Sequence, residues 1–460
     1  MSSGISCLDN RYSNDVKELI NVIDDFAYYR NRIYVELKYF ELFTSSIITY
    51  NPFIDFTHND YNKILEKENI LKHDVKAIEY FIKDIPEIKD TDKSHLIHIG
   101  LTSQDVNSLG FMMCFRDSLF IILNKLKNLI NIFTEQLITP YLDTPERITN
   151  DIVMLSFTHG QPATPTYFSK EMLIYKTRLD KIYEEINIFI DTELTVKFGG
   201  ASGNMNALNF SLPDTNWKEW ADYFVQLFTL ELEHENNNSE YSNYKNQKKQ
   251  YKFKRSQYTN QCDNYDSVIK VLYMIKRMLH ILEHLRGNLW LYIHREYLIQ
   301  KNIKDEIGSS TMPHKINPID LENAKTSIEI GKRMIDGICD ILTETSYQRD
   351  ISDSSALRNI SSIFGYVLMT LKKITIGISR LSPNIKKIKE ELNDHPEVIL
   401  EGIQTYLKIH CNIENAYEII KTFARGKNIT ILDIYCMIDE LEINEIHKFR
   451  LKNLTPENYK

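Results

Sequence analysis

Three long stretches of the chain place apolar residues at every third or fourth position, and this spacing constrains the fold more than any other feature. The stretches cover residues 112–137, 168–189 and 268–289. Steps of three and four residues put apolar side chains on one face of an α-helix. Each stretch exceeds the average helix of about 11 to 12 residues, and its apolar face needs partner helices. The sequence therefore predicts an all-α fold with a bundle of long helices, which also indicates assembly between subunits.

The composition supports long helices and excludes several classes of protein. Only 15 glycines and 12 prolines occur in 460 residues, below average usage, which disfavours many short strands and tight turns. A net charge of −8 argues against a dedicated nucleic-acid binder. The hydrophobic content of 43% argues against wholesale disorder. No stretch approaches 18 consecutive apolar residues, so we expect no membrane span.

The cysteines indicate a reducing compartment. No two of them form a CxxC pair, and no secretory signal precedes them: Cys7, Cys114, Cys262, Cys339, Cys411 and Cys436. No cluster of His and Cys has the short spacing of metal ligands. We therefore expect free thiols, no metal and a cytoplasmic location.

Segment 233–257 differs from the rest because it is rich in Asn and Lys and nearly without aliphatic residues. The favoured interpretation is a solvated surface insertion without a function of its own. A nucleic-acid patch is the sharper alternative, but the acidic balance of the chain disfavours it.

The string from Gly308 to Pro318, within a loop expected over 305–320, has the highest density of reactive groups. Its first half contains a glycine and small hydroxyl residues and should be mobile. Two prolines stiffen its second half, which contains Lys315 and Asn317. A flexible segment with hydroxyl groups beside a rigid segment with Lys and Asn suits a lid that closes over an anion.

Two further strings contain a histidine among polar residues. His159 lies between Thr158 and Gly160, just before two prolines, and is either a surface residue or a positioned acid or base. The string 98–105 contains Thr102 and Ser103, which could donate hydrogen bonds to a carboxylate or cap the next helix. His73 opens a helix, where backbone donors favour anions.

The string 348–359 places Arg349 and Arg358 around a pair of serines. Two guanidinium groups can make several charge-assisted bonds to one phosphate. Surface arginines paired with Asp350 and Asp353 are an equally good interpretation of this string alone. The glycines of 199–203 lack the features of a phosphate loop and should only turn the chain.

These strings resemble a known family. Residues 308–318 look like the signature loop of the fumarase/aspartase superfamily, and residues 312–323 are similar to its adenylosuccinate lyase family. Residues 72–76, 258–261 and 349–358 resemble that family as well, and the likeness runs from Leu8 to Tyr459. Three features depart from the family pattern. Asn10 replaces a usual Gly, Asn260 and Cys262 flank the matching Gln261, and the insertion at 233–257 is extra.

The resemblance implies three helical domains over 1–106, 107–363 and 364–460, the central one forming the helical core of a homotetramer. It implies active sites shared between subunits, with adenylosuccinate as substrate and AMP and fumarate as products. It implies no cofactor, no nucleic acid and no membrane.

The resemblance also implies residue roles. Ser309 is the general base, His159 the general acid, and Lys315 and Asn317 stabilise the developing carboxylate charge, while His98 orients the phosphate or its neighbours. The substrate-binding positions follow the same match: Arg11, Tyr12, Lys72, His73, Asp74, Thr102, Ser103, Gln261, Ser310, Ile316, Asn323, Arg349, Ser354, Ser355, Ala356, Leu357 and Arg358.

Two alternatives stay open on the sequence. An argininosuccinate lyase would share the loop and the elimination but would have no phosphate to hold, which Arg11, Arg349 and Arg358 argue against. A non-catalytic helical scaffold should have lost His159 or Ser309, and both are present.

Overall fold

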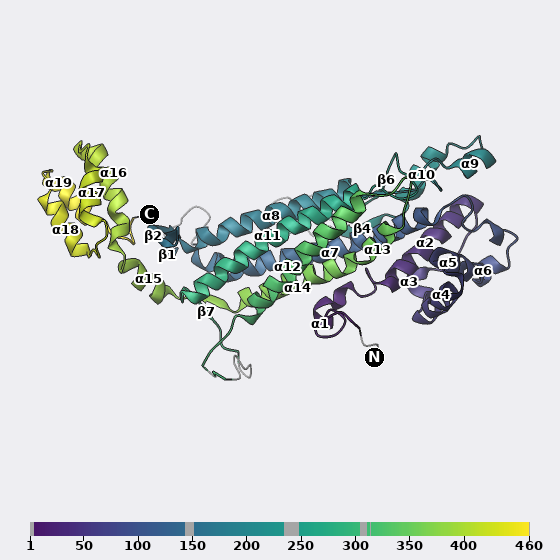
Figure 1. Cartoon of the computed structure of the whole chain (residues 1–460), viewed down its shortest axis with the longest axis horizontal. Helices are drawn as coiled ribbons and strands as arrows, with labels where there is room; N and C mark the ends of the chain where they lie inside the picture. Colours follow the sequence, from purple (N-terminus) through teal and green to yellow (C-terminus); the bar gives the residue numbers. More distant parts are fainter. Residues whose placement is uncertain (1–3, 143–150, 234–247, 304–310, 313, 460) are drawn as a thin grey trace. The chain divides into compact units, whose positions relative to one another are not determined.

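The computed structural model describes residues 4–142, 151–233, 248–303, 311–312 and 314–459, with the backbone alone described at 230–233 and 248–250. It confirms the all-α fold class (Figure 1). The three predicted helical stretches lie on the long helices α7 (Ser103–Leu137), α8 (Phe168–Thr192) and α11 (Asp266–His294). Two more long helices accompany them, α12 (Ile319–Thr343) and α14 (Ile360–Ser379).

The chain divides into two compact units, and each long helix contributes to both. Unit 1 comprises Met1–Asn128, Asp180–Glu283 and Asn323–Lys373, and unit 2 comprises Leu129–Leu179, His284–Glu322 and Ile374–Lys460. The three-domain division along the chain stays a prediction.

Unit 1 contains the shorter elements near the N-terminus and those that follow α8. Its helices outside the bundle are α1 (Ser13–Val16), α2 (Asp25–Thr44), α3 (Pro52–Asp55), α4 (His58–Leu71), α5 (Asp74–Lys83), α6 (Pro86–Lys89), α9 (Asn206–Ser211), α10 (Trp217–Gln226) and α13 (Ser352–Arg358). Its short strands form two pairs, β3 (Thr195–Val196) parallel to β6 (Lys254–Arg255), and β4 (Leu230–Glu233) antiparallel to β5 (Lys248–Tyr251).

Unit 2 contains a β-hairpin and the C-terminal helices. The hairpin joins β1 (Val153–Thr158) to β2 (Gln161–Tyr167), and β7 (Leu298–Gln300) pairs antiparallel with β8 (Leu381–Pro383). An apolar cluster is built largely from its last helices: α15 (Ile385–Asn393), α16 (Leu400–Cys411), α17 (Ala416–Ala424), α18 (Ile431–Glu440) and α19 (Glu445–Lys452).

Within unit 1 the bundle helices pack closely. Phe115 of α7 meets Phe364 of α14 edge to face, with ring centroids 5.5 Å apart. Gly331 of α12 faces Leu279 of α11. The helical stretches 103–141 and 352–379 are apolar enough to cross a membrane by length and composition. However, 78% and 61% of their most apolar windows are buried inside the protein, as in core helices.

The prediction that 233–257 is a solvated insertion is wrong for its last residues. Tyr251 and Phe253 are buried, and the guanidinium of Arg116 lies 4.8 Å above the Phe253 ring. Arg255 forms an ion pair with Asp222 of α10. Two aromatic side chains within a polar run are enough to anchor it to the core. Residues 234–247 lie outside the described part of the chain.

A buried ion pair ties two loops of unit 1 to α7. Asp105 and Lys197 are both fully buried, and Lys197 Nζ lies 2.7 Å from Asp105 Oδ1. The same carboxylate accepts hydrogen bonds from the backbone N–H groups of Thr102, Gly199 and Gly200. One side chain therefore fixes both the start of α7 and the glycine turn at 199–203.

We expect Lys197→Met to lower the free energy of unfolding by about 3 to 5 kcal/mol, because it leaves the Asp105 charge buried without its cation. Urea unfolding followed by circular dichroism measures the change. Adding Asp105→Asn should recover part of the loss, since no charge is then left unpaired. The exposed Lys218 provides the control, and Lys218→Met should change the stability little. Equal unfolding midpoints for the two methionine variants would refute this role for the pair.

Candidate active site

A pocket of about 710 Å³ in unit 1 brings together residues that are far apart in the sequence. Its lining includes the end of α4, the start of α5, the start of α7, the loop before α11 and helix α13. Eight residues of the predicted site line it: Lys72, His73, Asp74, Ser103, Gln261, Arg349, Ser354 and Arg358. Glu68, Asn107 and Ala201 also line this pocket, and no motif in the sequence selects them.

Arg349 is held by several partners in this pocket. Its Nη1 donates to Gln261 Oε1 at 3.0 Å, and its Nη2 donates to Ser354 Oγ at 3.3 Å. Its Nη2 also lies 3.7 Å from Asp353 Oδ1. The structure thus combines both interpretations of the arginine string, because Arg349 lines a pocket and also has an aspartate beside it.

Asp353 connects α13 to α7 and to the residue that precedes α11. Its Oδ2 accepts hydrogen bonds from Gln104 Nε2 at 3.0 Å and from the Tyr265 hydroxyl at 2.7 Å. Gln104, Tyr265 and Asp353 are all buried. This network fixes the position of α13, and with it the serines and arginines that line the pocket.

Asp74, the first residue of α5, sits between two arginines. The Nη1 of the fully buried Arg32 donates to Asp74 Oδ2 at 2.6 Å, and Arg358 Nη2 lies 3.6 Å from the same oxygen. The Arg32 guanidinium also lies over the rings of Tyr28 and Tyr29, 4.2 and 4.1 Å from their centroids. Burial acts to raise the pKa of Asp74, but the arginines outweigh it and hold that pKa below its usual value. Asp74 therefore stays ionised and orients Arg358.

The sequence did not single out Arg32. An arginine is rarely fully buried unless it is paired, but Arg32 follows Arg30 and Asn31, and nothing in this run distinguishes it. Its partner Asp74 lies on another helix, and the sequence alone does not reveal that contact.

Two predicted histidines of unit 1, His73 and His98, lie outside the helix interiors. His73 caps α5, and its Nδ1 accepts a hydrogen bond from the Lys76 backbone N–H. His98 lies in the turn before α7, where its Nδ1 is 2.5 Å from Oε1 of the buried Glu36. Ser103 is the first residue of α7, and Thr102 directly precedes it.

The remaining predicted residues of unit 1 are spread more widely. The Tyr12 hydroxyl donates to Asn323 Oδ1 at 3.4 Å, while Arg11 is exposed. Leu357 lines a second cavity of about 250 Å³ that shares Asp74, Ser354 and Arg358 with the larger pocket. Ser355 is exposed and Ala356 is buried.

The other predicted residues belong to unit 2. His159 is exposed at the tip of the β1–β2 hairpin, where it and Gly160 both have positive φ, 54° and 74°. Lys315 and Ile316 are exposed, and the Ile316 carbonyl accepts a hydrogen bond from Gln300 of β7. Asn317 is partly buried. Ser309 and Ser310 lie outside the described residues.

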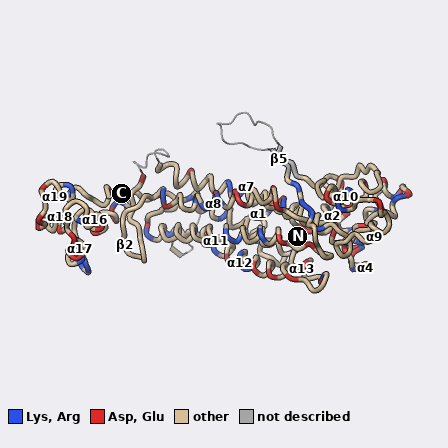
Figure 2. Tube along the Cα trace, turned by 90° about the horizontal axis from the view of Figure 1, so that it is seen from above, with Lys and Arg blue, Asp and Glu red and all other residues tan. Residues whose placement is uncertain are grey.

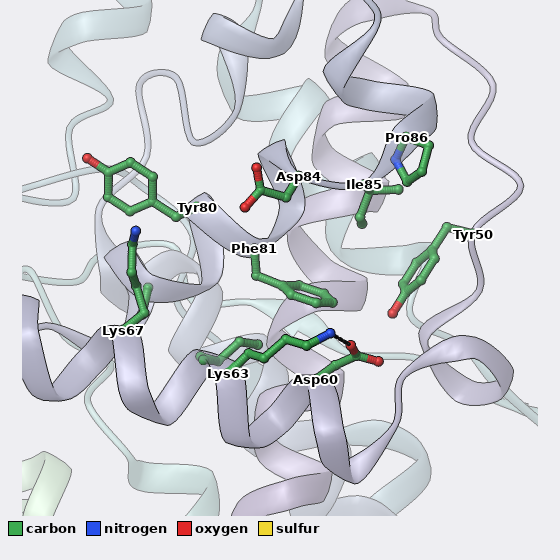
Figure 3. A pocket seen from close by; sticks show the side chains of 11 residues that line it. Tyr50, Asp60, Lys63, Lys67, Tyr80, Phe81, Asp84, Ile85 and Pro86 are labelled. Atoms are coloured by element: carbon green, nitrogen blue, oxygen red, sulfur yellow. Dashed lines mark hydrogen bonds and ion pairs between the residues drawn. The ribbon is translucent and has the colours of Figure 1, made fainter.

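A third cavity, of about 400 Å³, lies between α4 and α5 (Figure 3). Phe81 and Tyr50 line it, and Asp60 and Lys63 form an ion pair of 3.1 Å at its edge. None of its eleven lining residues belongs to the predicted site. The larger pocket is therefore the candidate active site.

Charges of both signs are interspersed along the described chain (Figure 2). Across the residues that the structure describes, no group of three or more His, Cys, Asp or Glu is placed to hold a metal ion. All six cysteines are free thiols.

Comparison with known proteins identifies relatives over nearly the whole chain. A family model described as "Lyase" matches residues 35–329, and one described as "Adenylosuccinate lyase C-terminal" matches residues 345–460. The adenylosuccinate lyase of Dictyostelium discoideum is 33% identical over 479 residues, covering 99% of this chain and 96% of that protein. The adenylosuccinate lyase of Escherichia coli K12 is 31% identical over 475 residues, with the same coverage.

Solved structures share the fold. A fumarate lyase from Mesorhizobium sp. BNC1 superposes with a TM-score of 0.72 at 14% identity, covering 96% of this chain and 94% of that chain. A 3-carboxy-cis,cis-muconate lactonizing enzyme from Pseudomonas putida gives a TM-score of 0.69 at 16% identity, covering 96% and 93%. At these identities the likeness concerns the fold alone.

We expect Asp74→Asn to destabilise the protein at neutral pH, because it leaves the buried Arg32 cation without its carboxylate. The folded pKa of Asp74 is lowered, so its contribution is present above the ordinary pKa of an aspartate and is lost as the pH falls through the folded pKa. The difference between parent and variant should therefore shrink toward low pH. Urea unfolding at a series of pH values measures it.

Asp84→Asn is the matched control, since Asp84 is exposed at the other end of α5. This control should track the parent at every pH. A deficit in Asp74→Asn that stays constant over the whole range would contradict the ion pair.

Proposed function

The chain belongs to the adenylosuccinate lyase family, and from that premise we propose that it eliminates fumarate from adenylosuccinate to leave AMP. We also propose that it performs the same elimination on succinylaminoimidazole carboxamide ribotide, in purine nucleotide biosynthesis. Family membership rests on two matched family models and on full-length relatives above 30% identity.

The pocket lined by Arg349, Arg358 and Ser354 supports a phosphorylated substrate. Guanidinium groups bind phosphate through paired, charge-assisted hydrogen bonds, and a serine hydroxyl beside them adds another donor. Argininosuccinate contains no phosphate, so this pocket favours adenylosuccinate. His73, Asp74 and Gln261 line the same pocket and are suited to the ribose and the base.

The proposed reaction breaks a carbon–nitrogen bond in two proton transfers. Ser309 removes the proton from the carbon beside a carboxylate, which leaves two negative charges on that group. Lys315 and Asn317 stabilise these charges as fixed donors, and Thr102, Ser103 and Ser310 hold the succinyl group. The electron pair then forms the double bond of fumarate, and His159 protonates the departing nitrogen.

The serine must be activated, because a hydroxyl is a weak base at its ordinary pKa. A cation beside the serine would stabilise the alkoxide, and Lys315 is the lysine of the signature string. His159 is exposed at a hairpin tip. This position suits a general acid that reaches a substrate bound outside the core of its own unit.

We further propose a cytoplasmic homotetramer whose active sites combine residues of several subunits. The long apolar helices support subunit assembly. His159, Lys315 and Asn317 belong to unit 2, whereas His98 and the candidate active-site pocket belong to unit 1. Free thiols support a reducing compartment.

The first test is turnover. Purified protein should release fumarate from adenylosuccinate, detected by absorbance, and should release none from argininosuccinate at the same concentration. Release from argininosuccinate alone would support the alternative enzyme, and release from neither would favour a non-catalytic scaffold.

The second test separates the acid from the base. Ser309→Ala should abolish exchange of the abstractable carbon proton of adenylosuccinate with deuterated solvent, because proton removal needs the hydroxyl. His159→Ala should lose turnover but retain exchange, because its defect lies in protonation of the leaving nitrogen. Ser310→Ala, at the neighbouring serine, controls for loss of a hydroxyl without loss of the base. Exchange that survives in Ser309→Ala and vanishes in His159→Ala would reverse the two roles.

A further inference from the structure

A buried carboxylate stands behind His98. Glu36 on α2 is fully buried, and its Oε1 lies 2.5 Å from His98 Nδ1, whose side chain is 15% exposed. The other oxygen, Oε2, is buried and has no hydrogen-bond partner among the described residues. An ionised carboxylate away from water needs a partner charge, and His98 is the group in position to supply it.

The other carboxylates near His98 have cations of their own. Glu79 of α5 pairs with Lys76 at 2.6 Å, and Asp105 of α7 pairs with Lys197 at 2.7 Å. No described lysine or arginine lies within ion-pair distance of Glu36, so His98 is the group that can balance the charge of Glu36. Burial acts to lower the pKa of His98, but the carboxylates, led by Glu36, raise it above its usual value.

The backbone around His98 is held in an uncommon conformation. His98 has φ of 64° and Gly100 has φ of 69°. The hydroxyl of Tyr39, three residues after Glu36 on the same helix, donates to the Ile99 carbonyl at 2.7 Å. Residues three or four apart share one face of a helix, so a single face of α2 supplies contacts to both the ring and the backbone of this turn. A strained backbone persists only where its surroundings fix it.

We propose that Glu36 is a positioning residue that holds His98 as an imidazolium, so that Nε2 is an N–H donor to an anionic group of the substrate. With Nδ1 bound to a carboxylate, the proton on Nε2 is the one left to donate. If the Glu36–His98 pair only stabilised the fold, the His98 ring would not need to carry a charge. The inference rests on the proposed lyase function for the identity of the anion, but the state of His98 is measured without substrate.

The experiment follows the ring of His98 in the full-length protein. Nuclear magnetic resonance of ring-labelled histidine gives its pKa and protonation state, with His98→Gln identifying the signal. Glu36→Gln keeps the size of the side chain and removes its charge, so the pKa of His98 should fall toward that of a free histidine. Glu36→Asp, which restores the charge, should recover part of the elevation even if Glu36→Gln folds poorly.

Two controls separate the pair from the general field of the protein. Glu41→Gln, on the same helix, removes a carboxylate that pairs with Lys38 and should leave His98 unchanged. Glu79→Gln should lower the pKa of His98 less than Glu36→Gln does. Identical titration of His98 in the parent, Glu36→Gln and Glu36→Asp would overturn the proposal.

Activity gives the second readout. With adenylosuccinate as the probe, kcat/KM of Glu36→Gln should fall by about tenfold or more at about pH 8, as when the partner that orients a functional histidine is lost. The loss should diminish toward lower pH, where His98 is protonated without help. A loss independent of pH would mean that Glu36 has only a structural role. If the protein turns over no adenylosuccinate, the proposed function is wrong. The resonance titration then still tests whether Glu36 sets the protonation of His98.

Discussion

The carboxylate of Asp105 is the constraint on which the site of unit 1 depends. Fully buried, it accepts hydrogen bonds from one ammonium group and three backbone N–H groups. Those donors come from the turn before α7 and from the glycine turn at 199–203, so one ionised side chain sets the distance between the two loops. Burial acts to lower the pKa of Lys197, and Asp105 opposes that shift only in part. The pair thus fixes the geometry of the two loops more than it stabilises the fold, because desolvation of both ions offsets most of their attraction.

Helix α2 also positions other segments through buried charged side chains, which lie along one of its faces. Arg32 and Glu36 are one helical turn apart, and each is fully buried against a charged or ionisable partner on another segment. Arg32 holds Asp74 at the start of α5, and Glu36 holds His98 in the turn before α7. Apolar packing would bring these segments together without fixing their register to a fraction of an ångström. Hydrogen-bonded ions do fix it, since a small displacement leaves a buried charge unpaired.

Much of the fold could be predicted from the sequence, and less of the site. Periodicity identified α7, α8 and α11 because the burial of one helix face repeats along the chain. The strings around His73, Arg349 and Arg358 were found because several reactive groups are adjacent there. Arg32, Glu36 and Lys197 cannot be selected from the sequence, because the partner of each lies on a segment remote in sequence. The polar residues around Tyr251 and Phe253 predict a solvated segment, but these two aromatic side chains are buried. Helical periodicity does not predict the hairpin that carries His159.

The two arginines of the pocket differ in how freely they can meet a ligand. The Arg349 side chain is 19% exposed and is held by Gln261, Ser354 and Asp353, so its fork is already oriented before a phosphate arrives. The Arg358 side chain is 46% exposed, and its ion pair with Asp74 is longer, at 3.6 Å. An exposed ion pair contributes little to stability, so Arg358 can turn toward an anion at small cost. Asp74 keeps its charge balanced by Arg32 when Arg358 turns away. The buried arginine therefore makes the exposed one available, which connects the packing of α2 to binding in the pocket.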